Sequence, residues 1–188
     1  MRKLFFLTFL FVISLNLCNN AAKAQNLPRP ASGKTMVIFE RPPLTAMAVQ
    51  IRLFDSSTYI GLMGAGGHLV YECSPGKKLF WATAENRDFM EADLAADQVY
   101  LVQVEAVAGA LTARVKLQPY NPTNKRADKV KKQFAKRIDK GREKKIGAAL
   151  GDQTPDRTRQ IIENGLQRYQ TLKQKNKKIT QITTDMHI

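Results

Sequence analysis

Short stretches of alternating apolar and polar residues run through the first two thirds of the chain. In residues 46–54, the apolar Val49, Ile51 and Leu53 alternate with polar neighbours. A period of two places alternate side chains on opposite faces of a strand, so this strand has one buried face. Comparable segments predict about seven to eight short strands, at residues 34–40, 46–54, 59–63, 68–73, 78–84, 89–94, 98–106 and 110–118.

Turn-forming residues separate these predicted strands. Residues 64–67 contain three glycines, and Ser74-Pro75-Gly76 joins a proline that fixes φ to a glycine that accepts positive φ. Many short strands joined by such turns are typical of a two-sheet sandwich. The sequence therefore predicts a mainly β fold, an antiparallel β-sandwich over residues 35–119.

A helical period replaces the alternation after Pro119 and Pro122. Val130, Phe134 and Ile138 recur every fourth residue, which predicts an amphipathic helix within residues 125–150. Its apolar stripe is narrow enough to pack on the sandwich or on a second helix.

A second helix is predicted to begin with Thr154 as its N-cap and Pro155 as its first residue. Its apolar stripe consists of Ile161, Ile162, Leu166, Tyr169 and Leu172. The two helices make up a basic tail over residues 124–178, and no element is predicted for residues 179–188.

The N-terminus has the pattern of an export signal. Arg2 and Lys3 precede an apolar run at residues 4–17, and Ala22-Lys23-Ala24 matches a cleavage site. We predict a signal peptide at residues 1–24, a mature start at Gln25, and a periplasmic or secreted location.

Two alternatives concern this segment. A retained membrane anchor is disfavoured because the apolar run is shorter than the roughly 20 residues of a span. Lipid anchoring at Cys18 is disfavoured because Leu17 stands where a small residue is usual. After cleavage only Cys73 remains, so no intrachain disulfide can form. Residues 25–34, with two prolines, are predicted to be a flexible lead-in.

Positive charge is concentrated in the tail. Residues 25–123 hold nine basic and nine acidic residues, whereas residues 124–188 hold eighteen basic and seven acidic ones. Such an excess favours an anionic partner. The residues predicted to contact an anionic surface are Lys125, Arg126, Lys129, Lys131, Lys132, Lys136, Arg137, Lys173, Lys175, Lys177 and Lys178.

Several stretches resemble a known bacterial family. The strand MVIFERP, the hairpin segment YIGLM, the turn HLVYECSPGKK and the segment ADLAADQVYLVQVEA are similar to the family catalogued as domain of unknown function 2846. The resemblance covers residues 35–119 and implies a transthyretin-like or carboxypeptidase-regulatory-like sandwich that is secreted or lipid-anchored and has no assigned activity. Lys78 stands where the family's turn carries a histidine, so no role of that histidine is transferred.

Motifs that could carry chemistry have simpler explanations. Ser32-Gly33-Lys34-Thr35 matches the end of a phosphate-binding loop, but Pro28 replaces the required glycine and a strand follows instead of a helix. The glycines at 64–67 lack the spacing of a dinucleotide fingerprint and indicate a hairpin turn.

Metal and nucleophile chemistry are weakly indicated. His68 and His187 lack the spacing of a zinc site, and no catalytic triad can be assembled. Cys73 and Trp81 fit core positions better than a reactive thiol and a ligand platform. The acidic residues at positions 85, 88, 91, 93 and 97 could bind calcium, but such residues more often form wet faces and turns. We therefore predict no catalytic residues, metal or cofactor.

Three functional hypotheses follow. The first is a non-catalytic envelope module that binds or braces an envelope protein or anionic surface, with the basic helices for docking. The second is an envelope enzyme, hydrolase-like, with an unrecognised carboxylate site. The third is nucleic-acid binding through the basic tail, which an exported location disfavours.

Overall fold

The computed structural model describes residues 27–44, 46–108, 113–147 and 155–188. The predicted signal peptide, Cys18 and the mature start at Gln25 lie outside these residues, as does the N-cap predicted at Thr154. The strands are β1 (Thr35–Glu40), β2 (Ile51–Asp55), β3 (Thr58–Met63), β4 (Gly67–Cys73), β5 (Gly76–Thr83), β6 (Arg87–Leu94), β7 (Val99–Ala108), β8 (Ala113–Pro119), β9 (Arg142–Glu143) and β10 (Thr180–Ile182). The helices are α2 (Ala127–Lys140) and α3 (Pro155–Gln174).

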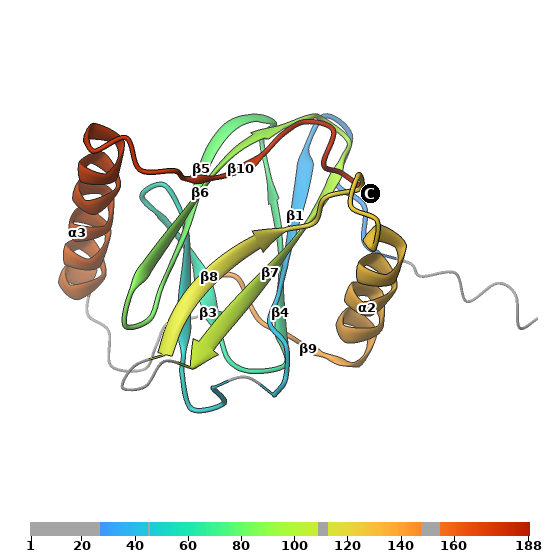
Figure 1. Ribbon diagram of the computed structural model, residues 1–188, viewed down its shortest axis with the longest axis horizontal. Coiled ribbons are helices and arrows are strands. Elements are labelled where there is room, and N and C mark those ends of the chain that lie inside the picture. The colour runs from blue at the N-terminus through green and yellow to red at the C-terminus, as the bar shows by residue number, and fades with distance from the viewer. Residues whose placement is uncertain (1–26, 45, 109–112, 148–154) are drawn as a thin grey trace, which may run out of the picture.

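Two five-stranded sheets form the body of the protein, and the predicted mainly β fold with two helices is confirmed (Figure 1). One sheet, named sheet A here, has the order β8-β7-β1-β4-β9, and sheet B has the order β10-β6-β5-β2-β3. The sheets are mixed rather than purely antiparallel, because β1 pairs parallel with β7, β4 with β9, and β6 with β10. Strand β9 lies in the tail, where the sequence predicted only helices, and strand β10 lies in residues 179–188, where it predicted no element.

The main core lies between the two sheets. Alternate residues of each strand point inward, as the period-two pattern predicts. Val37 and Phe39 of β1 are fully buried there, and they meet Leu53 of β2 and Phe80 of β5 in one apolar cluster. All eight predicted strands are present within the described residues.

The predicted strand at residues 46–54 begins only at Ile51, and a buried arginine explains the difference. Arg41 is fully buried, and its guanidinium donates hydrogen bonds to three backbone carbonyls. The acceptors are the carbonyl oxygens of Ala46 (2.7 Å), Val49 (2.5 Å) and Met63 (3.0 Å). Residues 46–49 therefore form a turn around the guanidinium and do not extend strand β2.

Helix α2 covers the outer face of sheet A. Its Phe134 is 1 % exposed and packs with Met36, Ile38 and Leu101, which point away from the main core. Strand β1 is therefore buried on both faces along its whole length. The helix ends at Lys140 rather than near residue 150. A Cβ on Gly141 would lie 2.4 Å from the carbonyl oxygen of Arg137, so the chain can pass this point only as glycine.

Helix α3 covers the outer face of sheet B, on the side of the molecule opposite α2 (Figure 1). Trp81 is fully buried beneath it, as predicted, between the rings of Phe54 and Phe89. The helix approaches closely at Gly165, where a Cβ would lie 2.4 Å from the Trp81 ring. The apolar stripe predicted for this helix missed that glycine, although it occupies the centre of the contact.

The segment after α3 connects both sheets. Strand β10 adds to the edge of β6, and the hydroxyl of Tyr100 donates to the carbonyl of Thr184 (3.0 Å). The amide of Ile188 donates to the carbonyl of Val99 in β7 (3.0 Å). Residues 179–188, for which no element was predicted, thus run from sheet B to sheet A.

Candidate functional site

The structure divides the predicted anionic-surface residues into two groups. Those from Lys125 to Arg137 lie on or just before α2, and those from Lys173 to Lys178 lie at the end of α3. Because the helices cover opposite sheets, the two groups lie on opposite sides of the molecule (Figure 1). They cannot contact one flat surface together.

Four lysines of α2 form a single row, which we name the lysine stripe: Lys129, Lys132, Lys136 and Lys140. At about 100° per residue these positions fall within a narrow sector of the helix, opposite Phe134. All four are exposed. The stripe is about 16 Å long, given a rise of roughly 1.5 Å per residue. Lys140 was absent from the predicted residues, although its spacing of four from Lys136 could have revealed it.

Packing fixes the direction in which the lysine stripe points. Phe134 is almost wholly buried against sheet A, and Val130 and Ile138 pack beside it. Burial of this apolar face turns the opposite face of α2 outward. The exposed Asp128 and Asp139 lie beside the stripe and reduce its positive charge without interrupting the row.

Arg137 belongs to the fold rather than to the outward face. Its Nη1 lies 3.2 Å from Oε2 of Glu40, whose side chain is 2 % exposed. Burial raises the pKa of the Glu40 carboxyl, and the charge of Arg137 opposes that increase. Of the predicted residues on α2, Arg137 is thus already committed to an ion pair.

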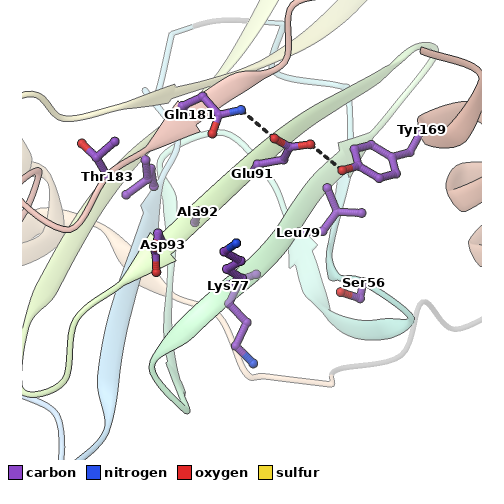
Figure 2. A pocket seen from close by; sticks show the side chains of 11 residues that line it. Ser56, Lys77, Leu79, Glu91, Ala92, Asp93, Tyr169, Gln181 and Thr183 are labelled. Carbon is purple, nitrogen blue, oxygen red and sulfur yellow. Dashed lines mark hydrogen bonds between the residues drawn. The ribbon is translucent and has the colours of Figure 1, made fainter. Parts of the chain in front are cut away.

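Lys173 is likewise engaged, because it forms an ion pair with Glu91, and Glu91 lines a groove of about 610 Å³ on sheet B (Figure 2). Glu91 of β6 accepts hydrogen bonds from the Tyr169 hydroxyl, from Lys173 Nζ (2.8 Å) and from Gln181 Nε2 (2.7 Å). Figure 2 shows Glu91 between Tyr169 of α3 and Gln181 of β10. These bonds to Lys173, Tyr169 and Gln181 lower the pKa of Glu91 to about 2. The central carboxylate of this groove therefore joins a helix to a strand.

Glu91→Gln should make the stability of the protein less dependent on pH. The lowered pKa means that the ionised form stabilises the fold above pH 4.5, and that this contribution is lost as the pH falls towards 2. Because the side chain is 24 % exposed, we expect a loss of only about 1 kcal/mol at pH 7. Urea unfolding of both proteins at pH 7 and near pH 2 measures it.

The two unfolding curves should converge at the lower pH. A difference that stays constant with pH would contradict an electrostatic role for Glu91. Glu163→Gln, on the exposed face of α3, is the matched control and should have little effect at either pH.

The groups considered for catalysis are used by the fold. Burial raises the pKa of the Cys73 thiol to about 11, so the thiol stays protonated at neutral pH. His68 is 5 % exposed, and burial lowers its pKa while Glu143 opposes the change. It lies opposite Glu40 in the β1–β4 ladder, whereas the His187 ring lies against that of Tyr100.

Three of the five acidic residues considered for calcium, Asp88, Glu91 and Asp97, have separate structural partners. Asp88 accepts a hydrogen bond from the backbone of Leu117 (2.7 Å), and Asp97 accepts one from Gly33 (2.7 Å). Within the ranges that the structure describes, no three His, Cys, Asp or Glu side chains gather as a metal site would require.

No helix in the described part of the chain is long and apolar enough to cross a bilayer.

Comparisons with known proteins do not assign a family. No protein-family model matches the sequence, and no curated protein matches it. The resemblance to domain of unknown function 2846 stays a prediction, and the lysine stripe is the feature that points to a partner.

Proposed function

We propose that this protein is an exported, non-catalytic β module of the cell envelope that the lysine stripe holds against an anionic lipid surface. The observation that carries the proposal is the orientation of α2. Its apolar face is buried against sheet A, so four lysines project outward in one row. A straight row of ammonium groups suits a flat array of phosphate-bearing headgroups.

The energy available is sufficient for reversible attachment. Each basic residue near an anionic membrane contributes about 1 kcal/mol, so four give roughly 4 kcal/mol before screening. Asp128 and Asp139 reduce this sum, and salt screens it over about 8 Å at physiological ionic strength. The attachment should therefore be released by a salt wash.

A binding role fits the polar groups better than catalysis does. Glu91 bridges α3 and β10, Asp88 bridges β6 and β8, and Cys73 carries a thiol with a raised pKa. The two carboxylates thus join elements of the fold, and the thiol stays protonated at neutral pH.

Charge reversal on the stripe should abolish attachment. The variant K129E/K132E/K136E is compared with K175E/K177E/K178E, which changes the charge equally on the opposite side of the molecule. Sedimentation with vesicles of phosphatidylcholine plus phosphatidylglycerol is the measurement, with pure phosphatidylcholine vesicles as the blank. We expect the stripe variant to lose at least about tenfold in affinity, a change of about 1.4 kcal/mol or more.

The control variant should retain most of the binding. If both variants lose the same vesicle affinity, binding depends only on the net charge of the protein, and the assignment of the contact to α2 is wrong. If the protein binds duplex DNA but does not bind the vesicles, its partner is nucleic acid and not a lipid surface. A salt wash of native membranes, with intact-mass analysis for a start at Gln25, tests the exported location.

A further inference from the structure

A second positively charged feature lies next to the lysine stripe. The turn from β3 to β4, the segment before β2 and the chain after α2 surround a pocket of about 570 Å³, which we name the turn pocket. The sequence predicted a hairpin at residues 64–67, but this turn links sheet B to sheet A, because β3 pairs with β2 and β4 pairs with β1. Its lining includes Gly64, Gly66 and Gln50 together with Lys140, Arg142 and Lys144. Among the described residues, no acidic one belongs to the lining.

Backbone hydrogen bonds fix the cations on this pocket. The amide of Arg142 donates to the carbonyl of Gly66 (3.2 Å), and the amide of Lys144 donates to the carbonyl of His68 (2.8 Å). The chain therefore runs along β4 as the short strand β9. Residues two apart on a strand share a face, so Arg142 and Lys144 point one way and Glu143 points the other. Glu143 instead pairs with His68 in the β4–β9 ladder, where burial lowers the pKa of the imidazole and the charge of Glu143 opposes that change.

Arg41 fixes the part of the turn pocket that comes before β2. Its guanidinium binds the carbonyls of Ala46 and Val49, which flank the lining residue Met47. Its backbone amide donates to Gly67 (2.9 Å), and its carbonyl accepts from Gly66 (3.1 Å). The same residue therefore fixes both the turn before β2 and the turn from β3 to β4, which gives the pocket a shape that exists before any ligand arrives.

Three cations converge on the pocket without compensation. Within the described part of the chain, none of Lys140, Arg142 and Lys144 forms an ion pair. Neighbouring like charges repel each other, and an anion between them would remove that repulsion. The arrangement thus favours a ligand with more than one negatively charged oxygen.

We propose that the turn pocket binds a phosphate group. The guanidinium of Arg142 can hold two phosphate oxygens with its parallel N–H groups, whereas Lys140 and Lys144 act as point charges on the remaining oxygens. Gln50 also lines the pocket, and its side-chain amide can donate a further hydrogen bond.

The inference rests on the proposed function and names the group that is recognised there. Lys140 belongs to both the lysine stripe and the turn pocket. A headgroup phosphate could enter the pocket when the stripe lies on a membrane, and a soluble phosphate could enter it without one.

Titration with inorganic phosphate at constant ionic strength tests the pocket itself, with amide chemical shifts as the readout and acetate as the comparison anion. We expect saturable shifts at residues 64–66 and 142–144 with phosphate and weaker ones with acetate. The variant R142Q/K144Q should lose at least about tenfold in phosphate affinity, because it removes two charge-assisted contacts. K175Q/K177Q is the control with the same change of charge and should bind as the parent does.

Vesicle sedimentation distinguishes the sources of the phosphate. If R142Q/K144Q loses affinity for both inorganic phosphate and phosphatidylglycerol vesicles, the pocket binds a lipid headgroup. If it loses affinity for inorganic phosphate alone, the pocket binds a soluble phosphate. Absence of saturable shifts in the parent protein, or equal phosphate affinity in R142Q/K144Q with an unchanged melting temperature, would overturn the inference. Loss of vesicle binding in the stripe variant would still support the proposed function in that case.

Discussion

Gly165→Ala should destabilise the protein by about 2 kcal/mol, although alanine is the better helix former. The exchange would stabilise an exposed helix by about 1 kcal/mol. In α3 the new methyl group would instead lie 2.4 Å from the Trp81 ring, which is fully buried and cannot move aside. Overpacking of this kind costs about 1–3 kcal/mol and would force α3 away from sheet B. Urea unfolding with tryptophan fluorescence measures the change, because Trp81 is the sole tryptophan.

A smaller residue beneath the helix should reverse the sign of this effect. Trp81→Leu alone removes stacking on Phe54, whose ring lies 4.0 Å away, and should cost a few kcal/mol, about 3 by comparison with other large core truncations. In that background, Gly165→Ala should stabilise by up to about 1 kcal/mol, because the methyl group gains space. If the alanine has the same effect with and without Trp81, the close contact does not control the docking of α3.

Arg41→Met should cost about 3–4 kcal/mol, the larger of the two effects. Methionine preserves the apolar volume of the stem but cannot donate to the carbonyls of Ala46, Val49 and Met63. A buried acceptor that loses its donor costs about 1–3 kcal/mol, and the carbonyl of Met63 is buried, whereas those of Ala46 and Val49 are part-buried and lose less. Part of the loss is offset because an arginine no longer has to be desolvated, a burden that also lowers the pKa of this guanidinium. The free energy of unfolding in urea is the measurement.

Arg41→Lys provides a matched control for charge. The ammonium keeps the positive charge but cannot reproduce the forked geometry, so we expect a loss smaller than that of methionine yet still measurable. Equal losses in both variants would mean that the fork matters more than the charge. Parent-like stability of Arg41→Met would contradict the organising role assigned to this residue.

The strands were predictable because alternation is a local property. Val37 and Phe39 alternate with Met36 and Ile38, and both sets proved to be buried, one between the sheets and one under α2. The sequence could not show this second burial, since it depends on where Phe134 docks. The parallel pairing of β1 with β7 was missed for the same reason. Partner choice is decided by distant packing rather than by local pattern.

The candidate site was predictable in composition but not in geometry. The concentration of lysine in the tail was visible, whereas its separation onto opposite sides required knowing that each helix covers a different sheet. Arg142 and Lys144 were missed because residues 125–150 carried a helical period. The triplet Arg142-Glu143-Lys144 has a strand-like alternation of charge that could have indicated β9.

The parallel pairing of β10 with β6 also has a kinetic consequence. Thr180 meets Met90 in this ladder, and Met36 meets Val99 in the β1–β7 ladder, so both contacts join residues far apart along the chain. Closing such long loops costs entropy before any contact energy is gained. Folding should therefore be slow for a chain of this size, on the millisecond-to-second scale typical of sheets with non-local pairing.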